Sequence, residues 1–238
     1  MFLSNLREVF YIMKLSNDTI TILKNFSEIN PNLMIKSGNI LTTHDHGCTM
    51  YSTAQIGEMF DCKRDFGIYD LKEFLQTIAM FRDPELTFEE NYVDIIDTQD
   101  ASVRTRYYRA DDDVLKESTV FRRVNLDKLP PATAAFDLSN TNLKRVERAC
   151  GVLKCPDVRF VGKNGKIIAV VYDKSNAIPN TFTVDLVEGY AGNDFDLHVT
   201  QKKLVMIDGD YHCEIIDNRA LKCKHVNKNL YYLITFDA

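Results

Sequence analysis

Three segments of the chain place their hydrophobic residues at the spacing of an amphipathic α-helix. In residues 139–154 the apolar side chains share one side of a helical wheel: Leu143, Val146, Cys150 and Leu153. Ser16 is a suitable N-cap for a second helix that continues to about Ile29. A third apolar stripe runs through residues 70–81. We expect each of these helices to bury one face and expose the other.

Alternating or continuous apolar runs between these segments predict β-strands. The expected strands are residues 33–35, 40–43, 49–54, 92–96, 103–109, 118–124, 135–138, 158–161, 167–172, 182–187, 195–199, 211–216, 221–226 and 230–236. Asn164-Gly165 separates two of them, and this dipeptide is typical of a tight hairpin turn. A fourth, shorter helix is expected over residues 200–207. Few helices among many hairpin-connected strands indicate an α+β fold.

The double proline at residues 130–131 interrupts regular structure, because proline lacks the backbone N–H donor. We place a domain boundary there, with one domain over residues 13–128 and another over residues 129–238. Each domain is expected to hold two helices and a majority of strands, which indicates internal duplication. Residues 1–12 are treated as an N-terminal extension.

The chain is long enough to bury a sizeable core, with 238 residues of which 45% are hydrophobic. No apolar run approaches the roughly 20 residues that a membrane span needs. Arg7 and Glu8 interrupt the N-terminal segment, which therefore does not read as a secretory signal. The six cysteines include no CxxC pair, so we expect no zinc finger and no disulfide framework, and we expect a reducing cytosol as the location.

Charge is distributed unevenly along the sequence. The chain has a net charge of −5, but residues 139–154 hold four basic residues against the single acid Glu147, a net of +3. The four expected helices together carry +4, so the rest of the chain carries −9. Taken alone, one basic helix is explained by a solvated face, because clusters of like charge usually face water. If all four helices share one side, that side attracts phosphate while the strands repel it.

Several short stretches resemble the opening of the sliding clamps of T-even-type bacteriophages. They are residues 13–19, Leu23-Lys24-Asn25-Phe26, Ile29-Asn30, Lys36-Ser37-Gly38, Ile68-Tyr69-Asp70-Leu71 and Phe74-Leu75. The resemblance is dense from residue 13 to about residue 75. In the second half it rests on the order of elements, the basic helix and Gly209-Asp210-Tyr211. The chain departs from the family pattern at Asn17, where a basic residue is expected, and residues 1–12 have no counterpart, so that Met13 is a candidate start.

The resemblance implies a DNA-clamp fold, in which three subunits of two similar domains close into a ring around double-stranded DNA. It implies a processivity factor of the viral replicative DNA polymerase, placed on DNA by an ATP-driven clamp loader, with no enzymatic activity and no cofactor. It also implies docking of short hydrophobic peptides from other replication proteins and viral late transcription factors, in an apolar pocket whose residues the sequence does not identify. The setting would be the cytoplasm of an infected bacterial host.

The basic residues that the resemblance places in the hole of the ring lie on the four expected helices. They are Lys24, Lys72, Lys144, Arg145, Arg148, Lys202 and Lys203. A closed ring is linked to DNA topologically, so weak contacts to phosphate suffice to centre the duplex and permit sliding. Such contacts carry no base readout, and binding is therefore independent of sequence.

Two other readings remain open at the level of sequence. His44, Asp45 and His46, followed by Cys48, could supply metal ligands, as in a metal-dependent phosphohydrolase. Against this reading, neighbouring residues of a strand point to opposite faces, and no Walker, GxSxG or HExxH motif is present. The second alternative is a monomeric binding module that uses the basic helix alone, whose affinity for DNA would collapse with salt.

Overall fold

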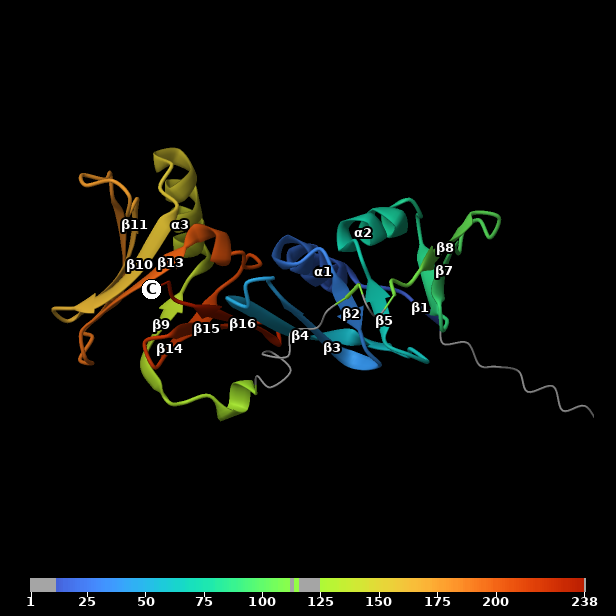
Figure 1. Ribbon diagram of the computed structural model, residues 1–238, viewed down its shortest axis with the longest axis horizontal. Coiled ribbons are helices and arrows are strands. Elements are labelled where there is room, and N and C mark those ends of the chain that lie inside the picture. Colours follow the sequence, from blue (N-terminus) through green and yellow to red (C-terminus); the bar gives the residue numbers. More distant parts are fainter. Residues whose placement is uncertain (1–11, 112–113, 116–124, 238) are drawn as a thin grey trace, which may run out of the picture. The chain divides into compact units, whose positions relative to one another are not determined.

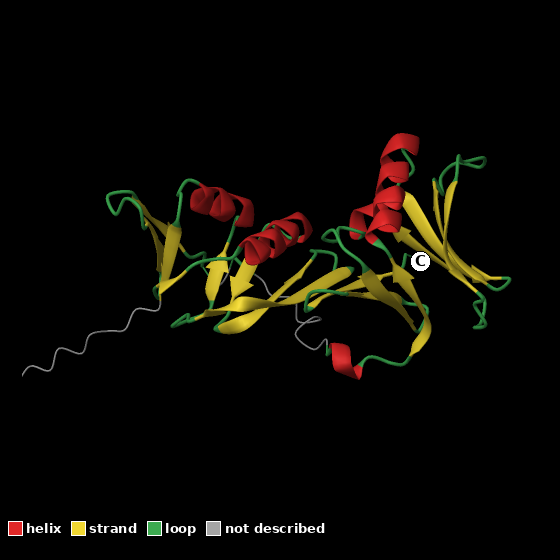
Figure 2. Cartoon of the chain, turned by 180° about the vertical axis from the view of Figure 1, so that it is seen from behind, coloured by secondary structure: helices red, strands yellow, loops and turns green. Residues whose placement is uncertain are grey.

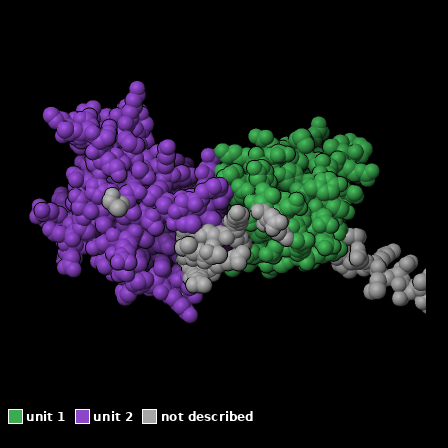
Figure 3. Space-filling view, in the orientation of Figure 1, with its two compact units in different colours: residues 1–27, 31–41, 56–116 green, residues 28–30, 42–55, 117–238 purple. Residues whose placement is uncertain are grey.

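The computed structural model describes residues 12–111, 114–115 and 125–237. The chain divides into two compact units (Figure 3). Unit 1 comprises Met1–Ser27, Pro31–Leu41 and Ile56–Lys116, and unit 2 comprises Glu28–Asn30, Thr42–Gln55 and Glu117–Ala238. The expected strand at residues 118–124 and residues 1–11 of the expected extension lie outside the described residues. The expected domain boundary after residue 128 stays a prediction.

Unit 1 combines two helices with short antiparallel strands. Its elements are β1 (Ile12–Met13), α1 (Asn17–Ile29), β2 (Leu33–Ile35), β5 (Phe66–Ile68), α2 (Leu71–Ala79), β6 (Pro84–Phe88), β7 (Tyr92–Asp97) and β8 (Arg104–Tyr108). Four of the strands form a sheet in the order β1-β6-β7-β8, and β2 pairs with β5. The hairpin of β3 (Gly38–His44) and β4 (Met50–Phe60) contributes residues to both units.

The two helices of unit 1 form where the sequence predicts them. Ser16 caps α1, because its Oγ accepts a hydrogen bond from the Thr19 N–H at 3.2 Å. Asp70 caps α2 by accepting from the Glu73 N–H at 3.0 Å. Phe26 of α1 and Leu71 of α2 are completely buried. Both helices lie on the same side of β2 and β5 (Figures 1 and 2).

Unit 2 holds one long helix and two sheets. Its elements are η2 (Leu126–Lys128), β9 (Ala132–Leu138), α3 (Asn140–Leu153), β10 (Asp157–Lys163), β11 (Lys166–Tyr172), β12 (Phe182–Glu188), β13 (Phe195–Thr200), η3 (Gln201–Lys203), β14 (Tyr211–Ile216), β15 (Ala220–His225) and β16 (Leu230–Thr235). One sheet has the order β12-β11-β10-β13, and the other has the order β3-β4-β16-β15-β14-β9. Helix α3 packs on β11 and β12.

The expected hairpin between β10 and β11 is confirmed. Asn164 and Gly165 have φ angles of 52° and 77°, the left-handed region that a two-residue turn of this kind requires. Lys163 pairs with Lys166 across the turn, which sets the register of the whole hairpin. This register directs Val158 and Phe160 of β10 into the core.

The expected fourth helix over residues 200–207 is wrong. Only Gln201–Lys203 form a single 3-10 turn, and Leu204 has already left helical geometry with φ −91° and ψ 35°. The cause is the consecutive apolar run 204–207, which has no polar side to leave in water. Leu204, Met206 and Ile207 are all buried, and such a run cannot form a helix with one exposed face. Within residues 125–237, α3 is therefore the one α-helix.

Candidate nucleic-acid interface

The basic face of α3 is fixed by burial of its opposite side. Ser139 caps the helix by accepting from the Asn142 N–H at 3.2 Å, and Lys154 ends it in the left-handed conformation. The buried residues are Leu143, Val146, Ala149 and Cys150. Because this stripe determines the rotation of the helix about its axis, the side chains of Lys144, Arg145 and Arg148 are exposed. The predicted phase of the helix is confirmed.

Lys144 already has two acidic partners. Its Nζ lies 3.0 Å from Glu147 Oε2, one turn along α3, and 2.5 Å from Asp208 Oδ1, which follows η3. The pKa of Lys144 is raised, chiefly by the hydrogen bond to Asp208 and then by that to Glu147. Arg145 instead donates to the Asn142 side chain at 3.3 Å. In the part of the chain that the structure describes, no carboxylate lies within ion-pair distance of Arg148.

Three further predicted residues lie on exposed surface. Lys24 is exposed on α1, beside the completely buried Leu23, and Lys72 is exposed on α2. These two lysines belong to the two helices that cover the same side of β2 and β5 (Figure 2). Lys202 is exposed on η3. Unit 1 and unit 2 thus each present basic side chains on helical elements.

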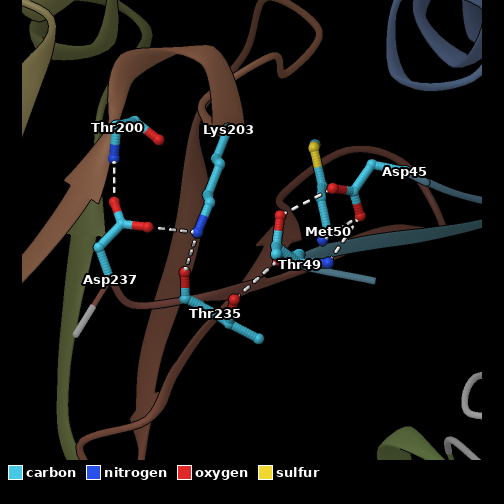
Figure 4. A network of polar contacts seen from close by, with 7 residues as sticks. All are labelled: Asp45, Thr49, Met50, Thr200, Lys203, Thr235 and Asp237. Carbon is cyan, nitrogen blue, oxygen red and sulfur yellow. Dashed lines mark hydrogen bonds and ion pairs between the residues drawn. The ribbon is translucent and has the colours of Figure 1, made fainter. Parts of the chain in front are cut away.

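Lys203 is held inside a network of polar contacts (Figure 4). Its Nζ donates to Asp237 Oδ1 at 2.6 Å and to the Thr235 carbonyl at 3.2 Å. Asp237 Oδ2 in turn accepts from the Thr200 N–H at 2.8 Å. The Lys203 side chain is only 15% exposed. Its ammonium group therefore ties η3 to the end of β16, and little of it is available to a ligand.

We expect substitution of Lys203→Met to destabilise the protein by about 1–3 kcal/mol, because Asp237 loses its charged partner while still largely buried. Burial raises the pKa of Asp237, but contacts with Lys203 and the Thr200 N–H outweigh it, so the net pKa is lowered. A carboxyl whose pKa is lowered on folding adds stability at pH values above its unfolded pKa of about 4. This stability is lost as the pH falls through the folded pKa. Urea unfolding of the wild type and of Lys203→Met at pH 7 and pH 3 measures this contribution to stability. The difference in free energy of unfolding between wild type and variant should be smaller at pH 3 than at pH 7. An equal difference at both pH values would contradict the stabilising role of the Lys203–Asp237 pair.

The sequence of this chain is similar to those of known proteins. A family model described as DNA polymerase processivity factor matches residues 16–115. The sliding clamp of Vibrio phage KVP40 is 29% identical over 205 residues, which cover 85% of this chain and 90% of that protein. The sliding clamp of Enterobacteria phage T4 is 28% identical over 204 residues, which cover 84% and 85%.

The fold agrees with these sequences. The structure of A. fulgidus PCNA bound to the C-terminal region of FEN-1 superposes with a TM-score of 0.67 at 13% identity, covering 95% of this chain and 97% of that one. The chain is thus similar in sequence to the sliding clamps of phages and similar in fold to a DNA clamp. The expected resemblance to the clamps of T-even-type phages and the expected α+β clamp fold are confirmed. The matching family is that of DNA polymerase processivity factors, whose role is not enzymatic, in agreement with the expectation for this chain.

The hairpin that suggested a metal site has a structural role. Asp45 Oδ1 accepts from the N–H groups of Thr49 and Met50, both at 2.7 Å, and its Oδ2 accepts from the Thr49 hydroxyl at 2.7 Å (Figure 4). His44 Nδ1 lies 2.9 Å from the Asp45 carbonyl oxygen. Among the described residues, no group of three histidine, cysteine or acidic side chains could hold a metal ion. Nothing in this hairpin supports the phosphohydrolase reading.

Sequence reasoning missed Asp208 as a neighbour of the basic face. The two residues of the Lys144–Asp208 pair are far apart in the chain, and no motif links them. The only sequence signal is that Asp208 directly follows the expected fourth helix.

No helix in the described ranges is long and apolar enough to cross a membrane.

Proposed function

We propose that the protein closes into a ring of three subunits, encircles double-stranded DNA without regard to sequence, and tethers the viral replicative DNA polymerase. The observation that carries this proposal is the exposed basic face of α3 in a chain of net charge −5. The proposed DNA-facing residues are Lys24, Lys72, Lys144, Arg145, Arg148 and Lys202. Lys203 is proposed to act in stability, because of its pair with Asp237.

The charge distribution supports sliding rather than tight binding. The region from Asp83 to Asp100 contains seven acidic residues and no lysine or arginine, so phosphate is repelled there. Contacts from exposed lysine and arginine to the DNA backbone are strongly screened by salt and independent of sequence. A ring that is held topologically does not need these contacts to be strong, and weak contacts allow it to move along the duplex.

Two unpaired sheet edges support assembly into a ring. Among the described residues, β8 is the outer strand of its sheet in unit 1, and β12 is the outer strand of its sheet in unit 2. An unpaired edge offers a row of backbone N–H and C=O groups to another strand. The opposite edges are less suitable, because β1 contributes only two residues within the described part of the chain and His198 of β13 is bridged by Asp237. Pairing of β8 in one subunit with β12 in the next would be a head-to-tail contact, which closes into a ring when the rotation allows it.

The two edges carry opposite charge. Strand β8 exposes Arg104 and Arg106, whereas β12 exposes Asp185 and Glu188. Within the subunit, Arg106 contacts Asp94 at 2.8 Å, and Lys166 lies near both acids of β12. These pairs are largely exposed, so they are easily exchanged for pairs across an interface. The complementary signs favour β8 against β12 over either edge against itself.

Further partners follow from the same family. The A. fulgidus clamp binds the C-terminal region of FEN-1, and we propose that this protein likewise takes short hydrophobic peptides from the polymerase, from other replication proteins and from viral late transcription factors. We also propose an ATP-driven clamp loader as a partner, and the cytoplasm of the infected bacterial host as the location. The proposed domains are residues 13–128 and 129–238.

The mass in solution tests the proposal. Light scattering over a range of protein concentrations should give three times the chain mass of 27.3 kDa, with dissociation only on dilution. A mass of one chain at every concentration would reject the ring and would favour a monomeric module that binds DNA through α3 alone.

A further inference from the structure

The cations of α3 differ in how much of their charge is available. Lys144 is held between Asp208 and Glu147, at 2.5 and 3.0 Å, while Arg148 on the same exposed face has no carboxylate within ion-pair distance in the described part of the chain. Helix α3 with its caps carries +3, and Asp208 reduces this to +2 over the combined surface. Both acidic partners lie at Lys144, so the positive charge of α3 is reduced most at this residue.

Asp208 is fixed in its place by the loop around it. The Ile207 N–H donates to the Tyr232 hydroxyl at 3.2 Å, and the Ile207 carbonyl accepts from the Tyr211 hydroxyl at 2.5 Å. Both tyrosines are completely buried. On the other side of Asp208, the Gly209 N–H donates to the side chain of Asn140 at 3.1 Å. The residue is therefore held beside the first turn of α3 by backbone contacts that do not involve its own carboxylate.

We propose that Asp208 limits the affinity of the clamp for DNA by competing with phosphate for Lys144. This inference rests on the proposed DNA-facing role of α3. A phosphate that approaches Lys144 must share an ammonium group that already donates to two carboxylates. It also meets the charge of Asp208, whose side chain is 65% exposed. Arg148 therefore contributes more to DNA affinity than Lys144, and the acid keeps the contact weak enough for sliding.

The test is the affinity of the full-length protein for a short fluorescent linear duplex, measured by anisotropy over a series of salt concentrations. We expect Asp208→Asn to tighten binding about two- to fivefold, the range that an exposed ion pair supports. The dependence of log affinity on log salt should become steeper by about one per subunit, because Lys144 now neutralises a phosphate. A change that only altered the fold would not steepen this slope.

Asp137→Asn is the matched control. Asp137 lies on β9 of the same unit, is 85% exposed and pairs only with His212 in the described structure, so its substitution makes the same change in net charge away from α3. It should leave affinity unchanged. In a Lys144→Gln background, Asp208→Asn should give a much smaller gain, because only the direct repulsion of phosphate by Asp208 is then removed. A gain of full size there would overturn the proposed competition for Lys144.

Arg148→Gln separates this inference from the function on which it rests. If Arg148→Gln weakens DNA binding and Asp208→Asn leaves it at the wild-type value, α3 faces DNA and the role of Asp208 is rejected. If Arg148→Gln has no effect on affinity, the DNA-facing role of α3 is itself rejected, and the inference fails with it. Circular dichroism should give each variant the wild-type melting temperature, since all of these side chains are exposed.

Discussion

Replacing Arg104 and Arg106 by glutamate should convert the assembled protein to single subunits. The substitutions place like charges opposite Asp185 and Glu188 at every proposed β8–β12 contact, and like-charge juxtaposition in an interface costs several kcal/mol. The subunit itself should remain folded, because both arginines are exposed and the Arg106–Asp94 pair is a surface pair. Light scattering at concentrations where the wild type is fully assembled measures the effect.

A reciprocal exchange controls for nonspecific damage. Asp185→Lys with Glu188→Lys should also give monomers, since the reversed β12 then faces the arginines of β8. Combining all four substitutions restores opposite signs and should restore assembly. If either double variant keeps the wild-type mass, or if the fourfold variant stays monomeric while folded, the proposed pairing of β8 with β12 is wrong.

The second large effect is expected from Lys144→Glu combined with Arg148→Glu. Together these changes take α3 with its caps from +3 to −1, so the helix repels the duplex instead of attracting it. We expect loading and processive synthesis to fall by about tenfold or more, since each subunit loses the phosphate contact of Arg148 and gains two negative charges on α3. Stability should change little because both side chains are exposed. The length of products from a primed circular template, copied by the polymerase with its clamp loader, is the measurement.

Lys163→Glu with Lys224→Glu provides the matched control for this experiment. Both lysines are exposed on strands of unit 2, at the end of β10 and on β15, so the net charge changes by the same amount away from α3. This variant should give products of wild-type length. Wild-type length from the α3 variant, or equal losses from both variants, would remove α3 from the DNA-facing surface.

Local patterns predicted most of the secondary structure. The spacing of Leu143, Val146 and Cys150 fixed the phase of α3, because a helix on a sheet must bury one stripe. The Asn164-Gly165 turn could be read directly from the sequence, since few other dipeptides accept positive φ at both positions. Strands β5 and β6 were missed. The first is only three residues long with a central glycine, Gly67, and the second begins at Pro84, and both residues are unfavourable in strands.

The electrostatic detail of the candidate site could not be predicted in the same way. Sequence identified Lys144 and Lys203 as basic residues on polar faces, and it had no means of pairing them with Asp208 and Asp237. Such contacts depend on where the chain returns after several strands, which no local period encodes. The same holds for the outer strands β8 and β12, because an edge depends on which strand lies beside it, and among the described residues no further strand pairs with either.

Retention on DNA tests the ring most directly. The protein would be threaded onto a linear duplex over its free ends, after which both ends are blocked with bulky groups. Enclosure of the duplex predicts that the protein stays bound through washes at moderate salt and is released when the duplex is cut between the blocks. Loss in salt at the same rate from blocked and open duplexes would show that contacts alone hold the protein, and would contradict the account.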